Sequence, residues 1–149
     1  GLRFSLGGET VEVAASGAID FTLGYPPRAS IWNWASLDGR TADGQKVGLN
    51  LVAHFMNGLE NALWLDDQLI PLPQAGFRYD HQKPLAPWRI TTVDGQIDIR
   101  FMPDGARREH LNAVLLRSRF IQPFGRFEGR IGDQPVSGHG VVEEHSALW

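Results

Sequence analysis

Apolar and polar residues alternate along much of this chain, which is the pattern of β-strands whose two faces meet different surroundings. Turns rich in Gly and Asp separate the alternating runs, and 17 glycines and nine prolines are spread through the sequence. Near the start, Gly7-Gly8 separates two short runs and is typical of a hairpin. The clearest further runs are Ile19–Tyr25, Ile31–Ser36 and Val47–Ala53. The pattern predicts half-buried strands joined by tight turns.

The strongest hairpin signal is Asp94-Gly95, which joins two runs rich in β-branched residues. After this turn, Ile97, Ile99 and Phe101 face one way and the charged residues between them face the other. About ten such strands with short turns predict an all-β fold with at most one short helix. The expected architecture is an antiparallel β-barrel or a strongly curved sheet, and the serial hairpins favour an up-and-down barrel.

The stretch from 106 to 120 fits two interpretations. As a helix it would place Leu111, Val114, Leu115 and Ser118 on one face. As a strand it would point Val114, Leu116, Ser118 and Phe120 inward, and Leu115, Arg117 and Arg119 outward. Because every neighbouring run has the β pattern, we predict a strand over about Ala113–Ile121.

Length and composition narrow the class of protein. A chain of 149 residues is expected to form one domain with a core large enough for stability. The net charge of −3 predicts no nucleic-acid partner, and the lack of cysteine excludes disulfides and thiolate chemistry. No run approaches the roughly 18 apolar residues of a transmembrane segment. The first residues also lack the apolar core of a signal peptide, so a cytoplasmic location is the working expectation.

Several polar and aromatic residues are candidates for a ligand-binding site. Asn33, Asn50 and His54 interrupt otherwise apolar strands, so they either bond to backbone groups or line a pocket together. Tryptophan side chains could line the same pocket or belong to the core. The candidate tryptophans are Trp32, Trp34, Trp64 and Trp149, with Trp88 as the fifth tryptophan of the chain.

The end of the chain carries the candidate catalytic residues. Glu143 and His145 share one face of a predicted strand, and Glu144 points to the other. A carboxylate beside an imidazole can act as an acid–base pair, because burial and charge coupling tune both groups toward neutral pH. The alternative is a solvent-facing Glu-x-His at the end of a strand. If Glu143 and His145 face solvent, Glu144 becomes the inward carboxylate.

Other kinds of site find little support in the sequence. The five histidines show no metal-ligand spacing, and no phosphate-binding loop or Gly-x-Ser-x-Gly elbow is present. We therefore expect no metal and no cofactor. Arg117, Arg119, Arg126 and Arg130 could hold a carboxylate, or form a solvated outer face with Glu128 as counter-ion.

A family resemblance rests on several motifs in order rather than on any single one. They are I-W-N-W-A-S at 31–36, D-G-x-x-V-G-L-N at 43–50, E-N-A-L-W-L-D at 60–66, P-W-R-I at 87–90, D-G-Q-I-D-I-R-F-x-P at 94–103, L-L-R-S-R-F at 115–120, F-G-R-F-E-G at 124–129 and G-V-V-E-E-H-S-A-L-W at 140–149. Over about 19–149 the chain resembles the family called domain of unknown function 2804.

That family is similar to a wider lipocalin-like superfamily that includes carotenoid hydratases and related proteins. The resemblance implies a lipocalin-like, calycin-type barrel, and it implies that this chain is the C-terminal half of a two-domain protein. Enzymes of the superfamily carry an acid near a late G-x-x-W-x-D-type motif. The comparable stretch here starts at Gly140, has Val142 in place of the tryptophan, and carries Glu rather than Asp.

Three hypotheses for the function follow. The first is a domain that binds a small apolar ligand, such as a lipid or an isoprenoid, in a hydrophobic pocket. The second is a cofactor-free enzyme domain of the hydratase, isomerase or cyclase type that uses acid–base residues. The third is a structural half that completes a two-domain protein, with an N-terminal sister domain or a second copy as its partner.

Overall fold

The computed structural model describes residues 2–14, 17, 19–21 and 23–149 and consists almost entirely of β-strands. Its one helical element is a 3-10 turn, η1, at Met56–Gly58, among the residues described. The strands are β1 Leu2–Leu6, β2 Glu9–Val13, β3 Ala29–Thr41, β4 Lys46–Ala53, β5 Ala62–Leu65, β6 Gln68–Pro71, β7 Ala75–Arg78, β8 Trp88–Thr92, β9 Ile97–Ala113, β10 Leu116–Ile131 and β11 Gln134–Leu148.

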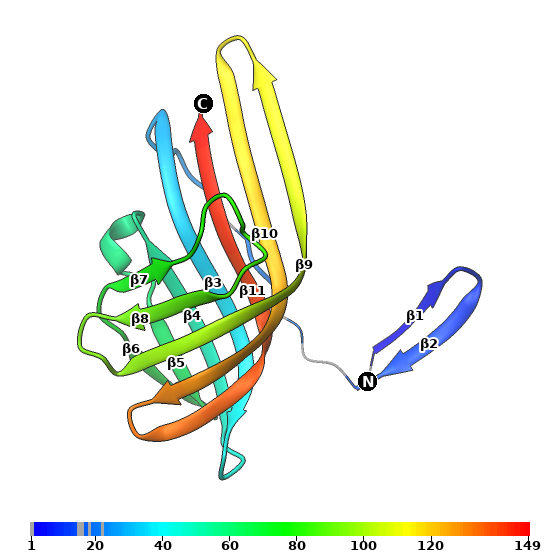
Figure 1. The fold of residues 1–149 in the computed structure, drawn as a ribbon, viewed down its shortest axis with the longest axis vertical. Coiled ribbons are helices and arrows are strands. Elements are labelled where there is room, and N and C mark those ends of the chain that lie inside the picture. Colours follow the sequence, from blue (N-terminus) through cyan, green and yellow to red (C-terminus); the bar gives the residue numbers. More distant parts are fainter. Residues whose placement is uncertain (1, 15–16, 18, 22) are drawn as a thin grey trace.

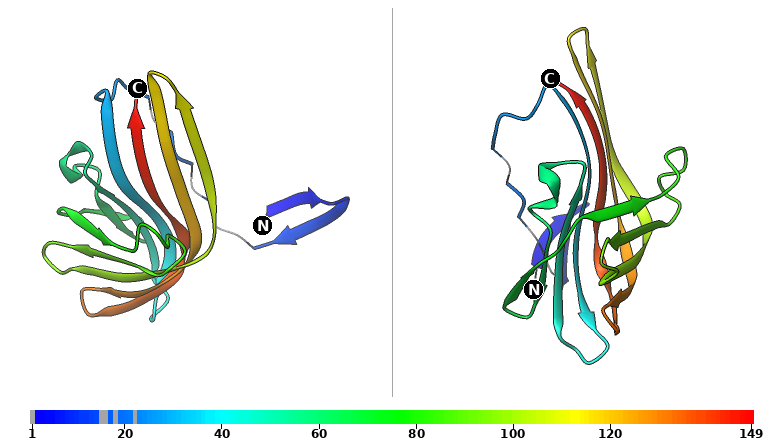
Figure 2. Two further views of the ribbon diagram at one scale, coloured as in Figure 1. Left: turned by 45° about the horizontal axis from the view of Figure 1, so that its top comes forward. Right: turned by 90° about the vertical axis from the view of Figure 1, so that its left-hand side faces the viewer.

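Nine of these strands form one antiparallel sheet in the order β6-β5-β4-β3-β11-β10-β9-β8-β7 (Figure 1). Most neighbours follow each other in the chain, and the exception is the long-range pair of β3 with β11. The sheet curls so that its two edges approach each other, and it encloses a half-barrel rather than a closed barrel (Figure 2). This result confirms the predicted all-β, strongly curved antiparallel architecture. The predicted Gly7-Gly8 hairpin is β1-β2, which forms a separate two-stranded sheet.

The long strands β9, β10 and β11 bend midway, and glycines allow the bend (Figure 1). The pairing of β9 with β10 shifts its register between Phe124 and Gly125. A Cβ on Gly125 would lie 2.9 Å from the Cα of Pro103 and even closer to the carbonyl oxygen of Met102. A larger residue could not occupy this position without moving the backbone.

The inner face of the curled half holds the core. Its largest fully buried side chains include Trp88, Phe101, Phe127, Leu51 and Leu63, which come from five different strands. Ile97, Ile99 and Phe101 all point into this core, as the alternation predicts. Side chains therefore fill the interior of the half-barrel, as in other small barrels.

The ambiguous stretch forms two strands rather than one. β9 ends at Ala113 and β10 begins at Leu116, so the predicted strand over 113–121 is wrong at its first residues. The predicted directions are also reversed, because Arg117 and Arg119 lie on the inner face and Phe120 on the outer face. The buried Ile121 and Phe127 set this parity, since every second residue of a strand shares a face.

The predicted strand at 19–25 is not formed among its described residues, and Thr22 lies outside them. Ile19, Phe21, Leu23 and Tyr25 are at least 83% exposed. No strand of the described sheet pairs with this stretch, so its alternating apolar side chains have no surface to cover.

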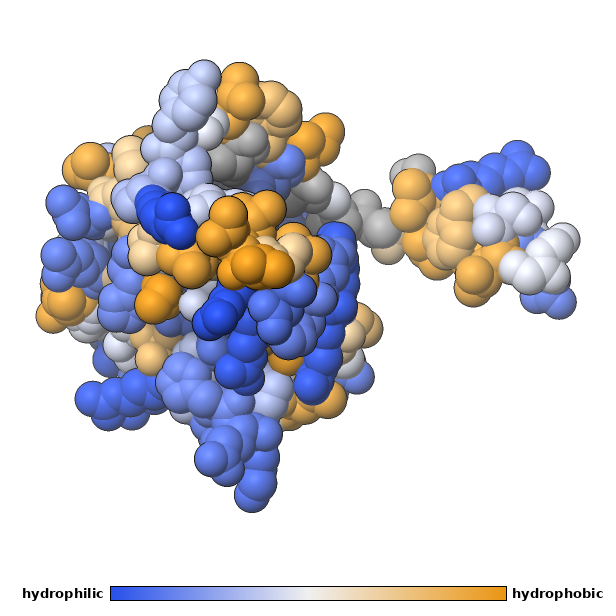
Figure 3. Space-filling model, turned by 90° about the horizontal axis from the view of Figure 1, so that it is seen from above, coloured by the Kyte–Doolittle hydropathy of each residue, from blue (hydrophilic) through white to orange (hydrophobic). Residues whose placement is uncertain are grey.

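Further apolar side chains gather at the tip formed by the end of β9 and the start of β10. In the view from above this tip points toward the viewer (Figure 3). The exposed large apolar residues of this tip are Leu111, Val114, Leu115 and Leu116. Among the described residues, no helix has the length and apolar character needed to cross a membrane.

Candidate functional site

The two adjacent glutamates of β11 divide the predicted site between the two faces of the sheet. Glu144 lies opposite Asn33 of β3 on the inner face, whereas Glu143 lies opposite Trp34 on the outer face. The remaining predicted residues within strands, Trp32, Asn50, Trp64 and His145, also lie on the outer face. The structure therefore does not bring the candidates into one cavity.

On the inner face, Glu144 is part of a network that joins four side chains. The Tyr79 hydroxyl donates to Glu144 Oε2 at a distance of 2.7 Å, and His81 Nδ1 lies 3.1 Å from the same oxygen. Asn33 Nδ2 donates to the Tyr79 oxygen at 2.9 Å and to the main-chain oxygen of Glu143 at 3.2 Å. Because Tyr79 accepts from Asn33, its own proton is directed at Glu144.

The second oxygen of Glu144 is open to the inner face. No hydrogen bond to Oε1 is found within the described residues, and the side chain of Glu144 is 19% exposed. Among the described residues, every fully buried side-chain oxygen or nitrogen has a hydrogen-bond partner. Because Oε1 has no such partner, it is not fully buried and contacts solvent. The carboxylate thus has one oxygen held by the protein and one available to a ligand.

Tyr79 marks the boundary between the packed core and the open part of the inner face. Its ring stacks on buried Trp88 with a centroid distance of 3.6 Å and an angle of 1°. Burial raises the pKa of Tyr79 above its ordinary value of 10, and the hydrogen bond to Glu144 raises this pKa further. At neutral pH the hydroxyl is therefore a proton donor of fixed direction.

Beyond Tyr79 the inner face is open and positively charged. We call this surface the basic inner wall, and it consists of Arg108, His110, Arg117 and Arg119, all exposed. The positive charge of Arg119 interacts electrostatically with the Tyr79 hydroxyl, and this is the smallest of the effects on the pKa of Tyr79, which it lowers. The sequence-based alternative of one solvated outer face is wrong for Arg117 and Arg119.

That alternative holds for the other two arginines. Arg126 and Arg130 lie on the outer face, where their partners are Asp104 at 3.4 Å and Asp98 at 4.0 Å. Glu128, the predicted counter-ion, makes no ion pair with a residue of the described ranges.

On the outer face, Glu143 is 7% exposed and both of its carboxylate oxygens have partners. Trp32 Nε1 donates to Oε1 at 2.8 Å, and Gln122 Nε2 donates to Oε2 at 3.1 Å. Burial raises the pKa of Glu143 above 4.5, although these two hydrogen bonds oppose the rise. The carboxylate of Glu143 therefore has no free oxygen, and it fixes the positions of the Trp32 and Gln122 side chains.

His145 lies on the same face but does not bond to Glu143. Its Nε2 is 2.8 Å from Ser118 Oγ, and its ring contacts Trp32 edge-on at a centroid distance of 4.3 Å. Burial lowers the pKa of His145 below 6.5. The predicted sharing of one face by Glu143 and His145 is confirmed, and their acid–base role stays a prediction.

The remaining candidates are dispersed. Trp34 Nε1 donates to Asn50 Oδ1 at 2.8 Å, and Asn50 donates to the Glu60 carbonyl, so Asn50 bonds locally on the outer face. Trp149 Nε1 lies 3.4 Å from Ser30 Oγ near the end of the chain. His54 is exposed and has a positive φ of 66° just after β4.

Tyr79 and His81 were not among the sequence candidates. The signal for Tyr79, which directly follows β7, was its alternation with Ala75 and Phe77 of that strand, all of which lie on the core side. Its contact with Glu144 spans 65 residues and depends on the curl of the sheet. In the part of the chain that the structure describes, no three His, Asp or Glu side chains gather as a metal site requires.

Comparisons with known proteins give a family and one structural likeness. The family model described as Domain of unknown function (DUF2804) matches residues 3–149. A crystal structure of kievitone hydratase from Nectria haematococca is similar at 19% sequence identity with a TM-score of 0.44. The likeness covers 77% of this chain and 39% of the hydratase, so the chain spans about two fifths of that protein. A search of the curated proteins found no significant match.

Proposed function

Because the chain belongs to the DUF2804 family, whose description leaves the function open, we propose a function from the inner face. The domain binds a small organic molecule on the open inner face beyond Tyr79, and this molecule has apolar surface and an acidic or hydrogen-bonding oxygen. The observation that carries the proposal is the half-engaged carboxylate of Glu144, with Oε2 held by Tyr79 and Oε1 open.

The surroundings of Glu144 support both parts of this ligand. Arg119 and the rest of the basic inner wall offer guanidinium groups that suit an anionic or carbonyl oxygen. Ile31, which is 60% exposed, supplies apolar surface opposite Ser146 on the same face. The core below Tyr79 is filled, so the ligand rests on the core rather than inside it.

The binding proposal can be tested with the fluorescent probe anilinonaphthalene sulfonate, which combines aromatic rings with one negative charge. Wild-type protein is expected to bind the probe saturably. Arg119→Gln should weaken binding about tenfold through loss of one charge-assisted contact. Glu144→Gln should strengthen binding of this probe, because its sulfonate has no proton to donate to Oε1 and is repelled by the carboxylate. Arg126→Gln, on the outer face in an ion pair with Asp104, is the matched control.

Opposite effects of the two inner-face substitutions, with no effect of the control, would support the site. Equal affinity of all four proteins would overturn it, because the probe would then bind elsewhere, for example on the apolar tip of β9 and β10. Native mass spectrometry of the purified protein is a second measurement, since a co-purified molecule should be lost in Arg119→Gln.

A second candidate is cofactor-free proton transfer at the same place. The observation that favours it is the convergence of Tyr79 and His81 on one oxygen of Glu144, at 2.7 and 3.1 Å. With Oε1 open, Glu144 can exchange a proton with a bound molecule while Tyr79 donates a hydrogen bond to the other oxygen.

Deuterium exchange distinguishes this candidate from simple binding. Cyclohexanone and cyclohexenone in heavy water should gain deuterium beside the carbonyl faster with wild-type protein than with Glu144→Gln. Equal rates with both proteins would exclude proton transfer by Glu144 on these ketones and leave binding as the function.

A further inference from the structure

Seven neighbouring strands place one residue each in a single row across the outer face. The cross-strand pairs are Arg78–Arg89, Arg89–Arg100, Arg100–Glu128, Glu128–Ser137, Ser137–Arg40 and Arg40–Lys46. We call these seven residues the arginine row. It lies at the opposite end of the long strands from the basic inner wall and on the opposite face.

The arginine row contains more positive charge than its own acids can balance. Three of its six cross-strand pairs place a cation opposite a cation, and only Glu128 is acidic. Like charges at directly opposite positions destabilise a sheet, because their side chains lie within about 5.5 Å of each other. An anion bound to these side chains on the outer face would reduce the repulsion between them.

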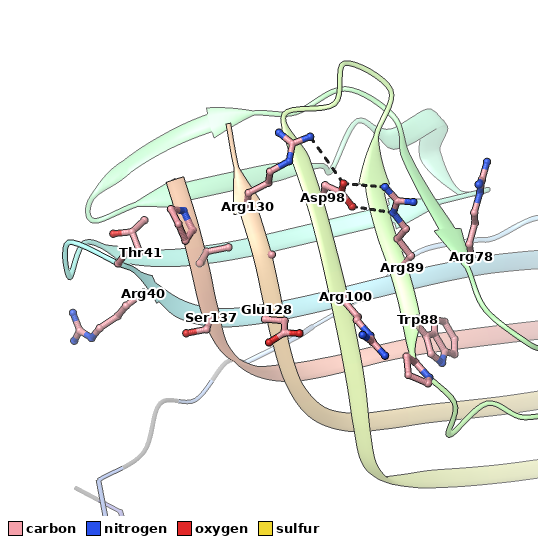
Figure 4. A pocket seen from close by; sticks show the side chains of 15 residues that line it. Arg40, Thr41, Arg78, Trp88, Arg89, Asp98, Arg100, Glu128, Arg130 and Ser137 are labelled. Atoms are coloured by element: carbon pink, nitrogen blue, oxygen red, sulfur yellow. Dashed lines mark hydrogen bonds and ion pairs between the residues drawn. The ribbon is translucent and has the colours of Figure 1, made fainter. Parts of the chain in front are cut away.

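The arginine row borders a hollow of about 950 Å³ (Figure 4). Five arginines line the hollow, namely Arg40, Arg78, Arg89, Arg100 and Arg130, against two acids, Asp98 and Glu128. The hollow therefore has an excess of three positive charges, whereas the whole chain has a net charge of −3. A concentration of charge opposite in sign to the protein attracts anions selectively to this place.

Some of these arginines are already engaged. Arg89 donates from Nε to Asp98 Oδ1 and from Nη2 to Asp98 Oδ2, and both distances are 3.0 Å. These hydrogen bonds hold the pKa of Asp98 below its ordinary value. Arg130 Nη2 lies 4.0 Å from Asp98 Oδ2, so one carboxylate serves two guanidinium groups (Figure 4). Arg40 donates to the carbonyl oxygen of Gly44 at 2.9 Å.

Arg78 and Arg100 remain unengaged, since neither makes a hydrogen bond or ion pair with any residue of the described ranges. They flank Arg89 in the arginine row, one strand to each side, so their backbones are about 10 Å apart. Their side chains point in different directions (Figure 4) but are exposed, so both planar guanidinium groups can turn toward one ligand that carries several oxygens.

We propose that the hollow beside the arginine row binds a small multivalent oxyanion, a molecule with two or more phosphate or carboxylate charges. Arg78 and Arg100 contact the anion directly, and Arg89 is held in place between them by Asp98. Ser137 offers a hydroxyl in the same row. This site is separate from the surface around Glu144 and does not depend on the function proposed there.

Titration calorimetry with pyrophosphate, and separately with citrate, tests the proposal at constant ionic strength. Wild-type protein should bind at least one of the two with one-to-one stoichiometry. Arg100→Gln and Arg78→Gln should each weaken binding about tenfold or more, the size of one charge-assisted contact. Arg126→Gln is the control, because Arg126 lies on the same face and strand as Glu128 but does not line the hollow.

Absence of saturable binding to wild-type protein would overturn the proposal. So would an equal loss in Arg126→Gln, because the attraction would then come from general charge. Denaturation by urea without anion provides a second readout: Arg78→Gln should unfold at the same or a higher urea concentration, since it removes the like-charge pair with Arg89 on the edge strand β7. A Glu144→Gln variant should bind pyrophosphate as the wild type does, which separates this site from the inner face.

Discussion

Glu143 and Glu144 are neighbours in the chain but belong to different environments. The carboxylate of Glu143 accepts from the Trp32 indole at 2.8 Å on the outer face, and that of Glu144 accepts from the Tyr79 hydroxyl at 2.7 Å on the inner face. Two identical side chains thus differ in burial and in the number of free oxygens. The first predictions concern these environments.

Glu143→Gln should change how stability depends on pH. Burial raises the pKa of Glu143 above 4.5, so the folded protein keeps a proton that the unfolded chain has already lost. Stability therefore falls as pH rises from 4.5 through the raised pKa, and the amide variant lacks this loss. Urea unfolding at about pH 4 and about pH 7 should show the variant gaining stability relative to wild type at the higher pH.

Glu60→Gln, which replaces an exposed carboxylate that makes no ion pair with a described residue, is the control for this measurement. Parallel pH profiles for wild type and Glu143→Gln would contradict the prediction.

His145 should show the opposite pH dependence. Burial lowers the pKa of His145 below 6.5, so the folded protein releases a proton that the unfolded chain still holds. Its contribution to stability is therefore complete above 6.5 and decreases as pH falls toward the lowered pKa. Proton NMR titration of the imidazole, assigned with His145→Gln, should give a midpoint below 6.5 in the folded protein. A midpoint at or above that of the urea-unfolded chain would show the prediction to be wrong.

Tyr79 should stay protonated well into the alkaline range. The chain has two tyrosines, so a Tyr25→Phe variant reports on Tyr79 alone. Ultraviolet absorbance should show phenolate only well above pH 10, because burial and the bond to Glu144 both disfavour the charged form. Adding Glu144→Gln should lower the midpoint, since it removes the negative charge. An unchanged midpoint in that double variant would mean that burial alone sets the pKa.

Gly138→Ala should destabilise the fold by about 3 kcal/mol, at the upper end of the cost of overpacking. Gly138 lies opposite Gly39, and its added Cβ would lie 2.8 Å from the buried ring of Phe127 and closer still to the Asp38 carbonyl oxygen. The matched control is Gly76→Ala on edge strand β7, where the nearest atom would be Thr91 Oγ1 at 3.8 Å. Equal denaturation midpoints for the two variants would contradict the packing described at Gly138.

Local patterns in the sequence were sufficient for much of the fold. The Asp94-Gly95 turn and the alternation of Ile97, Ile99 and Phe101 predicted a hairpin and its buried face, and both are present. The opposite directions of Glu143 and Glu144 also followed from the sequence. The reason is that the period of two residues is a property of the extended backbone itself.

The same reasoning was wrong in two cases: one predicted strand has no partner strand, and another has its buried face on the opposite side from the one predicted. Residues 19–25 alternate as clearly as β4, yet the described ones lie beside no strand and remain exposed. Along β10 the alternation of Arg117, Ser118, Arg119 and Phe120 was recognised, but its inward side was reversed. Periodicity determines which residues share a face, and packing against other strands decides which face is buried.

The sequence by itself therefore determined an all-β chain, its hairpins and the sorting of neighbouring residues to opposite sides. Only the tertiary structure decided which distant residues meet. The curl of the sheet brings Tyr79 to Glu144, and the register of seven strands aligns Arg78, Arg89 and Arg100. Such contacts depend on strand order, bends at glycines and side-chain packing over the whole molecule, and none of these is encoded in a local run of residues.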